Sequence, residues 1–178
     1  VRWSELSADV VFVQGVVLAA GRPLAEGMQL KAGDSFDTGA SGSLTLRLSD
    51  GATVVFPPNT QAGLGVSRGV PGTPVRATTI NLQKGSADST VVPLKDPASS
   101  FHIRTPRVVT AVRGTRFRVA AEGESSRHEV LTGVVAVAEA SQPTGAPGSA
   151  VLNEAQGLRA ESGRLGAVVT LLPAASVS

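Results

Sequence analysis

The chain has 178 residues, of which 42% are hydrophobic, 17% are charged and 3% are aromatic, and its formal net charge is +2. It contains no cysteine, which excludes a disulfide scaffold and a thiolate metal site, and it has no run of about 18 apolar residues that could span a membrane. The 20 glycines and 11 prolines punctuate a sequence rich in Val, Leu and Ala, which predicts an all-β single domain of many short strands.

Apolar and polar residues alternate along the N-terminal half, with glycine turns between the alternating segments. Residues 9–20 contain two apolar runs on either side of a glycine. Residues 43–58 give the clearest pattern: a strand, a turn at Asp50 and Gly51, and a return strand that ends at two prolines. Residues 65–76 are predicted to be a loop or the wide end of a hairpin.

The second half continues the alternation. Further strands are predicted at residues 78–92, 100–106, 108–122 and 127–140. The first of these is expected to turn at Lys84 and Gly85. Residues 141–150 are predicted to form a Pro/Gly linker or long loop, and residues 151–178 to supply C-terminal strands and a disordered tail. We therefore expect a β domain over 1–140, twisted and solenoid-like or sandwich-like, followed by a short extension.

Positive charge is concentrated in the middle of the chain. Residues 61–118 hold nine Lys or Arg and two Asp or Glu, whereas the flanking thirds are mildly acidic. A row of guanidinium groups can hold a phosphate, carboxylate or sulfate through paired hydrogen bonds. The candidate binding residues for an anionic partner are Arg104, Arg107, Arg113, Arg116 and Arg118. The alternative is a solvated strand face on which the arginines pair with Glu122, Glu124 and Glu129.

Gly114 and Thr115 interrupt this arginine-rich segment. A glycine inside a strand often marks a bulge or a tight corner, so this step is predicted to turn the strand, with Thr115 capping backbone groups. Together with Asp50 and Gly51, these two residues are the predicted structural turn residues.

The sequence gives little support for catalysis or metal binding. His102 and His128 are the only histidines, and no serine lies in the strand–turn–helix setting of a nucleophile elbow. Asp34, Asp37 and Asp50 suggest calcium, but their spacing is not that of an EF-hand and turn formation explains them. No cofactor, no metal site and no nucleic-acid partner is therefore predicted, the last because aromatic stacking platforms are scarce.

Two runs resemble the FecR domain family. They are "LKAGDSFDTGASGSLTLRLSDGATVVFPPNTQ" and "FHIRTPRVVTAVRGTRFRV", and the similarity covers residues 10–140. The resemblance implies a β-rich, non-catalytic domain that lies outside the cytoplasm, in the periplasm of the bacterial envelope for the best-studied members. There the domain is part of a membrane-spanning anti-sigma regulator and relays a signal from an outer-membrane transporter.

We therefore expect a non-catalytic extracytoplasmic binding or scaffold module for a protein or cell-wall partner, and not an enzyme. One alternative is the sensor segment of an anti-sigma regulator, with a membrane helix upstream in the full gene product. A second is an anion or glycan receptor, which requires Arg104, Arg116 and Arg118 to converge. A third is a cryptic hydrolase, which requires a histidine within hydrogen-bond reach of a serine in a cleft. A free sheet edge could also accept a partner strand.

Overall fold

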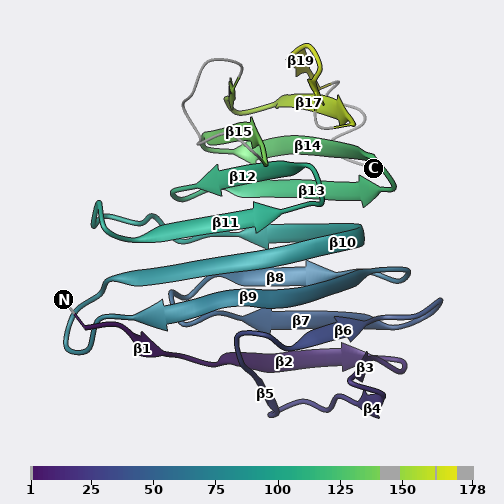
Figure 1. The fold of residues 1–178 in the computed structure, drawn as a ribbon, viewed down its shortest axis with the longest axis vertical. Helices are drawn as coiled ribbons and strands as arrows, with labels where there is room; N and C mark the ends of the chain where they lie inside the picture. The colour runs from purple at the N-terminus through teal and green to yellow at the C-terminus, as the bar shows by residue number, and fades with distance from the viewer. Residues whose placement is uncertain (1, 141–148, 163, 172–178) are drawn as a thin grey trace.

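The strands of the protein lie across its long axis and are stacked one above another, as the computed structural model shows (Figure 1). The structure describes residues 2–140, 149–162 and 164–171, and these residues form strands and turns without a helix. They accordingly contain no helix of the length and hydropathy needed to cross a bilayer. The prediction of an all-β fold with many short strands is confirmed.

The strands form two sheets, here called sheet A and sheet B. Sheet A contains β1 (Ser4–Glu5), β3 (Leu18–Ala19), β4 (Arg22–Pro23), β6 (Ser35–Asp37), β9 (Gln61–Gly69), the first part of β10 (Arg76–Thr90), β11 (Ser100–Arg104), β12 (Val108–Val112), β15 (Val135–Glu139) and β16 (Ala150–Leu152). Sheet B contains β2 (Ala8–Gln14), β5 (Gln29–Leu30), β7 (Ser43–Arg47), β8 (Thr53–Phe56), the second part of β10, β13 (Arg116–Glu122), β14 (Ser125–Thr132), β17 (Gln156–Glu161), β18 (Arg164–Leu165) and β19 (Val169–Thr170).

Neighbouring strands are ordered along the stack. In sheet A the central order is β9, β10, β11, β12, β15, β16, and in sheet B it is β2, β7, β8, β10, β13, β14, β17. The described pairings are antiparallel, apart from the parallel pairing of β10 with β11. A parallel neighbour requires the chain to cross back to the same end of the sheet, and residues 91–99 make this crossing.

β10 joins the two sheets because it bends at Gly85. Up to Lys84 it pairs with β9 in sheet A, and from Gly85 onward it pairs with β13 in sheet B. Gly85 has a φ of 93°, and an added Cβ would collide with Thr60 and lie 2.6 Å from the carbonyl oxygen of Asn59. The predicted turn at Lys84 and Gly85 therefore takes the form of a bend between sheets and not of a hairpin.

The core lies between the two sheets. Phe101 of sheet A and Phe117 of sheet B meet edge to face with their ring centroids 6.5 Å apart, and Phe36 and Phe56 do the same at 4.8 Å. Inward residues alternate with outward ones along most strands, as expected for two sheets packed face to face. Each fully buried aliphatic or aromatic side chain stabilises the fold by roughly 1.5–3 kcal/mol.

The C-terminal strands extend the same two sheets. β16 pairs with β15 in sheet A, and β17 pairs with β14 in sheet B. Leu152 and Leu158 are buried in these strands, with 0% and 2% exposure. Residues 141–148, which include most of the predicted linker, and residues 172–178, which include the predicted tail, lie outside the described residues.

Candidate functional site

β13 carries two of the five predicted arginines on the outward face of sheet B. Arg116 and Arg118 share this face because side chains two residues apart point to the same side of a strand, while Phe117 and Val119 point into the core. Both guanidinium groups approach the carboxylate of Asp88 in β10. Arg118 Nη2 lies 3.3 Å from Oδ2, and Arg116 Nε lies 3.9 Å from Oδ1. One carboxylate is thus shared by two arginines.

Charged residues continue across sheet B beside this cluster. Asp88 is the strand partner of Arg118, and Arg118 is the partner of Glu129 in β14. These three side chains alternate in sign along one row. Because exposed ion pairs contribute only about 0–1 kcal/mol each, the row does little for stability. The ion-pair partner of Arg116 and Arg118 is Asp88, whereas the sequence had suggested glutamates as partners.

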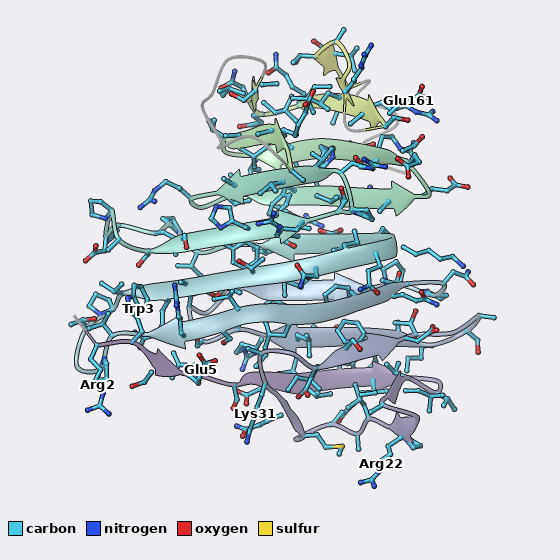
Figure 2. All side chains as sticks on the ribbon, viewed as in Figure 1. Arg2, Trp3, Glu5, Arg22, Lys31 and Glu161 are labelled. Atoms are coloured by element: carbon cyan, nitrogen blue, oxygen red, sulfur yellow. The ribbon has the colours of Figure 1, made fainter. Side chains whose placement is uncertain are left out.

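Two further arginines lie in the next row of the same face. Arg127 of β14 is directly opposite Arg159 of β17, and both are exposed. Like charges in directly opposite positions destabilise a strand pair. Arg159 Nε lies 3.2 Å from Oε1 of Glu161, which Figure 2 labels beside β17, whereas Arg127 forms no ion pair with the described residues.

We call this surface the arginine face. It consists of Arg116, Arg118, Arg127, Arg159, Asp88, Glu129 and Glu161. Sequence reasoning missed Arg127 and Arg159 because both lie in the acidic last third of the chain. In β14, Arg127 is exposed between buried Ser126 and His128, so its side chain points outward.

Arg113, another predicted binding residue, holds a loop in place. Its Nη1 donates to the carbonyl oxygen of Ser99 at 3.0 Å, and its Nη2 donates to those of Leu94 at 3.0 Å and Asp96 at 2.8 Å. Three carbonyl acceptors occupy much of the donor capacity of one guanidinium group. Arg113 therefore fastens the crossover loop between β10 and β11 to the end of β12.

Arg104 and Arg107 lie away from the arginine face. Arg104 ends β11 on the outward side of sheet A, next to half-buried His102, whose pKa is lowered by burial and by the Arg104 charge. Arg107 Nε pairs with Glu124 Oε2 at 2.9 Å between two exposed turns. Arg104 does not converge with Arg116 and Arg118, because the chain crosses from sheet A to sheet B between β12 and β13.

The predicted turn residues lie at two connections. Between β7 and β8, Asp50 Oδ1 accepts a hydrogen bond from the amide of Ala52 at 2.9 Å, and Gly51 has a φ of 87°. Between β12 and β13, Gly114 has a φ of 123° and an added Cβ would lie 2.6 Å from Pro93 Cα. Glycine is needed at this crossing for both its conformation and its size.

Thr115 follows Gly114 at the corner between β12 and β13. Its Oγ1 is buried without a hydrogen-bond partner among the described residues. Its carbonyl oxygen instead accepts the amide of Val91 at 2.8 Å. The backbone, and not the hydroxyl, therefore makes the polar contact at this corner.

His128 forms a serine–histidine contact, but in the core. Its Nδ1 lies 2.8 Å from Thr110 Oγ1 and its Nε2 lies 2.9 Å from Ser126 Oγ. His128 is 1% exposed and Ser126 is 6% exposed. Burial lowers the pKa of His128 to about 4, so the ring is neutral at pH 7. Both ring nitrogens are occupied and the pair lies between the sheets, so the geometry suits a structural link and not a nucleophile.

The aspartates that suggested calcium instead organise turns. Asp34 Oδ2 accepts the amide of Lys31 at 2.8 Å, and Asp37 Oδ1 accepts the amide of Gly39 at 2.8 Å. Among the residues in the described ranges, no three His, Asp or Glu side chains gather as a metal site would require.

The family model for the FecR protein matches residues 34–136, which is more than half of the chain. No curated protein matches the chain.

Solved structures share the fold. Two crystal structures, at 2.50 Å and 1.65 Å resolution, of a protein described as a putative anti-sigma factor from Parabacteroides distasonis each match with a TM-score of 0.58 and 18% identity. The match covers 77% of this chain and 59% of that one, so the chain spans less than two thirds of its neighbour's length. At this identity the likeness concerns the fold.

Proposed function

Because the chain belongs to the FecR protein family, we propose that it is the sensing segment of an anti-sigma type regulator, that it lies outside the cytoplasm, and that it binds a protein partner without catalysis. The neighbours described as an anti-sigma factor support the regulatory part of this proposal. In the FecR-type arrangement the sensing part is periplasmic, and the same location is proposed here.

The arginine face is the observation that carries the binding role. Arg116 and Arg118 are about half exposed, with side-chain exposures of 55% and 46%, although they share Asp88. Each guanidinium group has five donors in a planar fork, so most of this donor capacity faces solvent. Arg116 and Arg118 share the single carboxylate of Asp88, and Arg127 forms no ion pair with the described residues, so this face offers guanidinium donors to a partner with acidic side chains.

The proposal requires rigid presentation of these arginines, and the fold supplies it. β13 lies between β10 and β14, and residues 116–121 pair on both sides. The inward residues Phe117 and Val119 are buried at 1% and 0% exposure. A protein partner would therefore meet a preformed face, which lowers the entropic cost of binding.

Site-specific photo-crosslinking in the host bacterium tests the proposal. A photo-reactive residue in place of Arg127 is expected to give a discrete adduct, identified by mass spectrometry as a component of the regulator's signalling pathway. The same residue in place of Arg104, on the outward side of sheet A, serves as the control. Equal adducts from both positions, or none from Arg127, would overturn the arginine face as the binding surface.

A transcript measurement tests the regulatory role separately. Deleting the gene is expected to change transcription of a sigma-factor regulon, and the wild-type gene is expected to restore it. A gene carrying Arg116→Ser and Arg118→Ser is expected to restore it less well. An unchanged transcriptome after deletion would contradict the regulatory role.

A further inference from the structure

A pocket of about 340 Å³, lined by both charged and apolar side chains, lies where the turn between β7 and β8, the start of β10 and the crossover loop meet. One wall is the turn between β7 and β8, with Ser49 and Asp50. A second wall is the start of β10, with Arg76, and the third is the crossover loop, with Lys95. Elements from both sheets thus meet at this pocket, whose size is within the range of small-molecule sites.

The crossover loop is held in place before any ligand arrives. Arg113 donates three hydrogen bonds to loop carbonyl groups, as described above. Ser99 Oγ accepts the amide of Arg76 at 3.1 Å, and Asp96 Oδ1 accepts the amide of Ala98 at 2.8 Å. A preorganised wall reduces the entropy lost on binding.

Asp50 is the unusual group of this pocket. It forms no ion pair with the described residues, and it has only two hydrogen bonds, from the Ala52 amide at 2.9 Å and from Thr78 Oγ1 at 3.3 Å. Burial raises its pKa, against the opposing effect of these hydrogen bonds and of Arg76. Each carboxylate oxygen can accept a further hydrogen bond, so Asp50 could receive a donating or cationic ligand group.

The opposite wall carries the cationic guanidinium group of Arg76. Arg76 Nη1 is engaged by the carbonyl oxygens of Thr73 at 2.7 Å and Val75 at 2.8 Å, but its Nε is buried without a partner among the described residues. On the first wall, beside Asp50, Ser49 Oγ is also buried without a hydrogen-bond partner among the described residues. Buried polar groups without partners are uncommon in folded proteins. Lys95 adds an exposed ammonium group to the rim.

The charges around the pocket balance. Arg76 and Lys95 are cationic, and Asp50 and Asp96 are anionic. A purely anionic ligand would be repelled by the carboxylate of Asp50, and a purely cationic ligand would be repelled by the guanidinium group of Arg76. A zwitterion can place each of its charges beside the opposite charge of the pocket. The remaining lining includes the apolar side chains of Pro74, Pro93 and Leu94. These features together select a small molecule with both charges and an aliphatic part.

We propose that this pocket binds a small zwitterion of the α-amino acid class, with its ammonium group at Asp50 and its carboxylate at Arg76 and Lys95. The aliphatic side chain of the ligand contacts the prolines and Leu94. The inference does not depend on the arginine face or on the regulatory role, because a different surface carries it.

Backbone amide NMR shifts of the full chain, titrated with L-valine, test the proposal. L-valine is expected to give saturable shifts at Asp50, Ala52, Thr78 and Lys95. L-valinamide, which lacks the carboxylate, and N-acetyl-L-valine, which lacks the ammonium group, are each expected to bind at least about tenfold more weakly, since each removes one charged hydrogen-bonding partner. No saturable shift, or equal affinity for the three compounds, would overturn the proposal.

Asp50→Asn separates binding from folding, because an asparagine oxygen can still accept the Ala52 amide. This variant is expected to lose affinity for L-valine by about tenfold. Asp37→Asn, the same change in a turn outside the pocket, is the matched control and is expected to bind as the wild type does. Where the Asp50 variant does not fold, Lys95→Gln replaces it. Wild-type affinity in the folded pocket variant would also overturn the proposal.

Discussion

His128 is the titratable residue that is buried in the core of the described structure. It lies between the sheets, hydrogen-bonded to Thr110 of sheet A and Ser126 of sheet B. Its pKa falls from 6.5 to about 4 because burial disfavours the charged ring. Between pH 4 and pH 6.5, His128 is therefore protonated in the unfolded chain and neutral in the folded chain. Stability from this residue is fully present above pH 6.5 and is lost as the pH falls towards 4.

We expect the free energy of unfolding of the wild type to decrease by about 2–3 kcal/mol through this residue between about pH 7.5 and pH 4.5. Urea denaturation at both pH values measures the decrease. The His128→Gln variant keeps hydrogen-bonding capacity without titrating, so its decrease is expected to be smaller by that amount. The raised pKa of Asp50 acts with the opposite sign and is common to both proteins. An identical decrease in both would contradict the role of His128.

The arginines of the arginine face are expected to matter for binding and little for folding. Arg118→Ser removes one contact to Asp88 at 3.3 Å between side chains that are 46% and 29% exposed. Because water screens such a pair, the free energy of unfolding is expected to change by less than about 1 kcal/mol. Thermal or urea unfolding gives the value. A loss of several kcal/mol would show that the pair supports the fold instead.

At the scale of elements, the bend in β10 holds the two sheets together. Gly85 adopts a φ of 93° at the position where β10 leaves sheet A and enters sheet B. A side chain here would be strained by its backbone conformation and would also collide with Thr60. Both costs arise in the folded state, because the unfolded chain is free of each.

Gly85→Ala is therefore expected to lower the free energy of unfolding by about 2–4 kcal/mol. Gly33→Ala is the matched control, because Gly33 has a similar φ of 96° but nothing lies within 4 Å of an added Cβ. The control is expected to lose about 1 kcal/mol, from backbone strain alone. Urea denaturation compares the two variants. Equal losses would show that the contact with Thr60 costs nothing.

At the scale of the whole molecule, the two sheets grow together along the stack (Figure 1). β16 and β17 pair along the edges of β15 and β14, and their residues Leu152, Leu158 and Ala160 are at most 2% exposed. The predicted division after residue 140 would separate these strands from their partners. Their burial argues that the part before residue 140 depends on them.

A chain that ends at residue 140 is expected to be less stable than the full chain by about 3–6 kcal/mol, since two leucine side chains of the core are lost. Removal of residues 172–178 alone, which leaves every described strand intact, is the control. Urea midpoints of the two truncated proteins give the comparison. An unchanged midpoint for the shorter chain would establish residues 1–140 as an independent folding unit.

Local pattern in the sequence was sufficient for several features. Alternation predicted that Arg116 and Arg118 point outward and Phe117 and Val119 inward, because successive side chains on a strand point to opposite sides. The Asp-Gly pair at positions 50–51 indicated a turn, since glycine adopts a positive φ without strain. The family resemblance rested on these same runs of residues. Each signal lies within a few neighbouring positions.

The tertiary structure alone decided which side chains meet. Arg104 and Arg118 both follow an alternating pattern, yet they lie on different sheets because the chain crosses over between β12 and β13. Three other features also depend on contacts between distant segments. They are the hydrogen bonds of Arg113 to the crossover loop, the position of Arg127 opposite Arg159, and the pocket at Asp50. Strand periodicity sets the face that a side chain occupies, whereas pairing and register between distant strands set its neighbours.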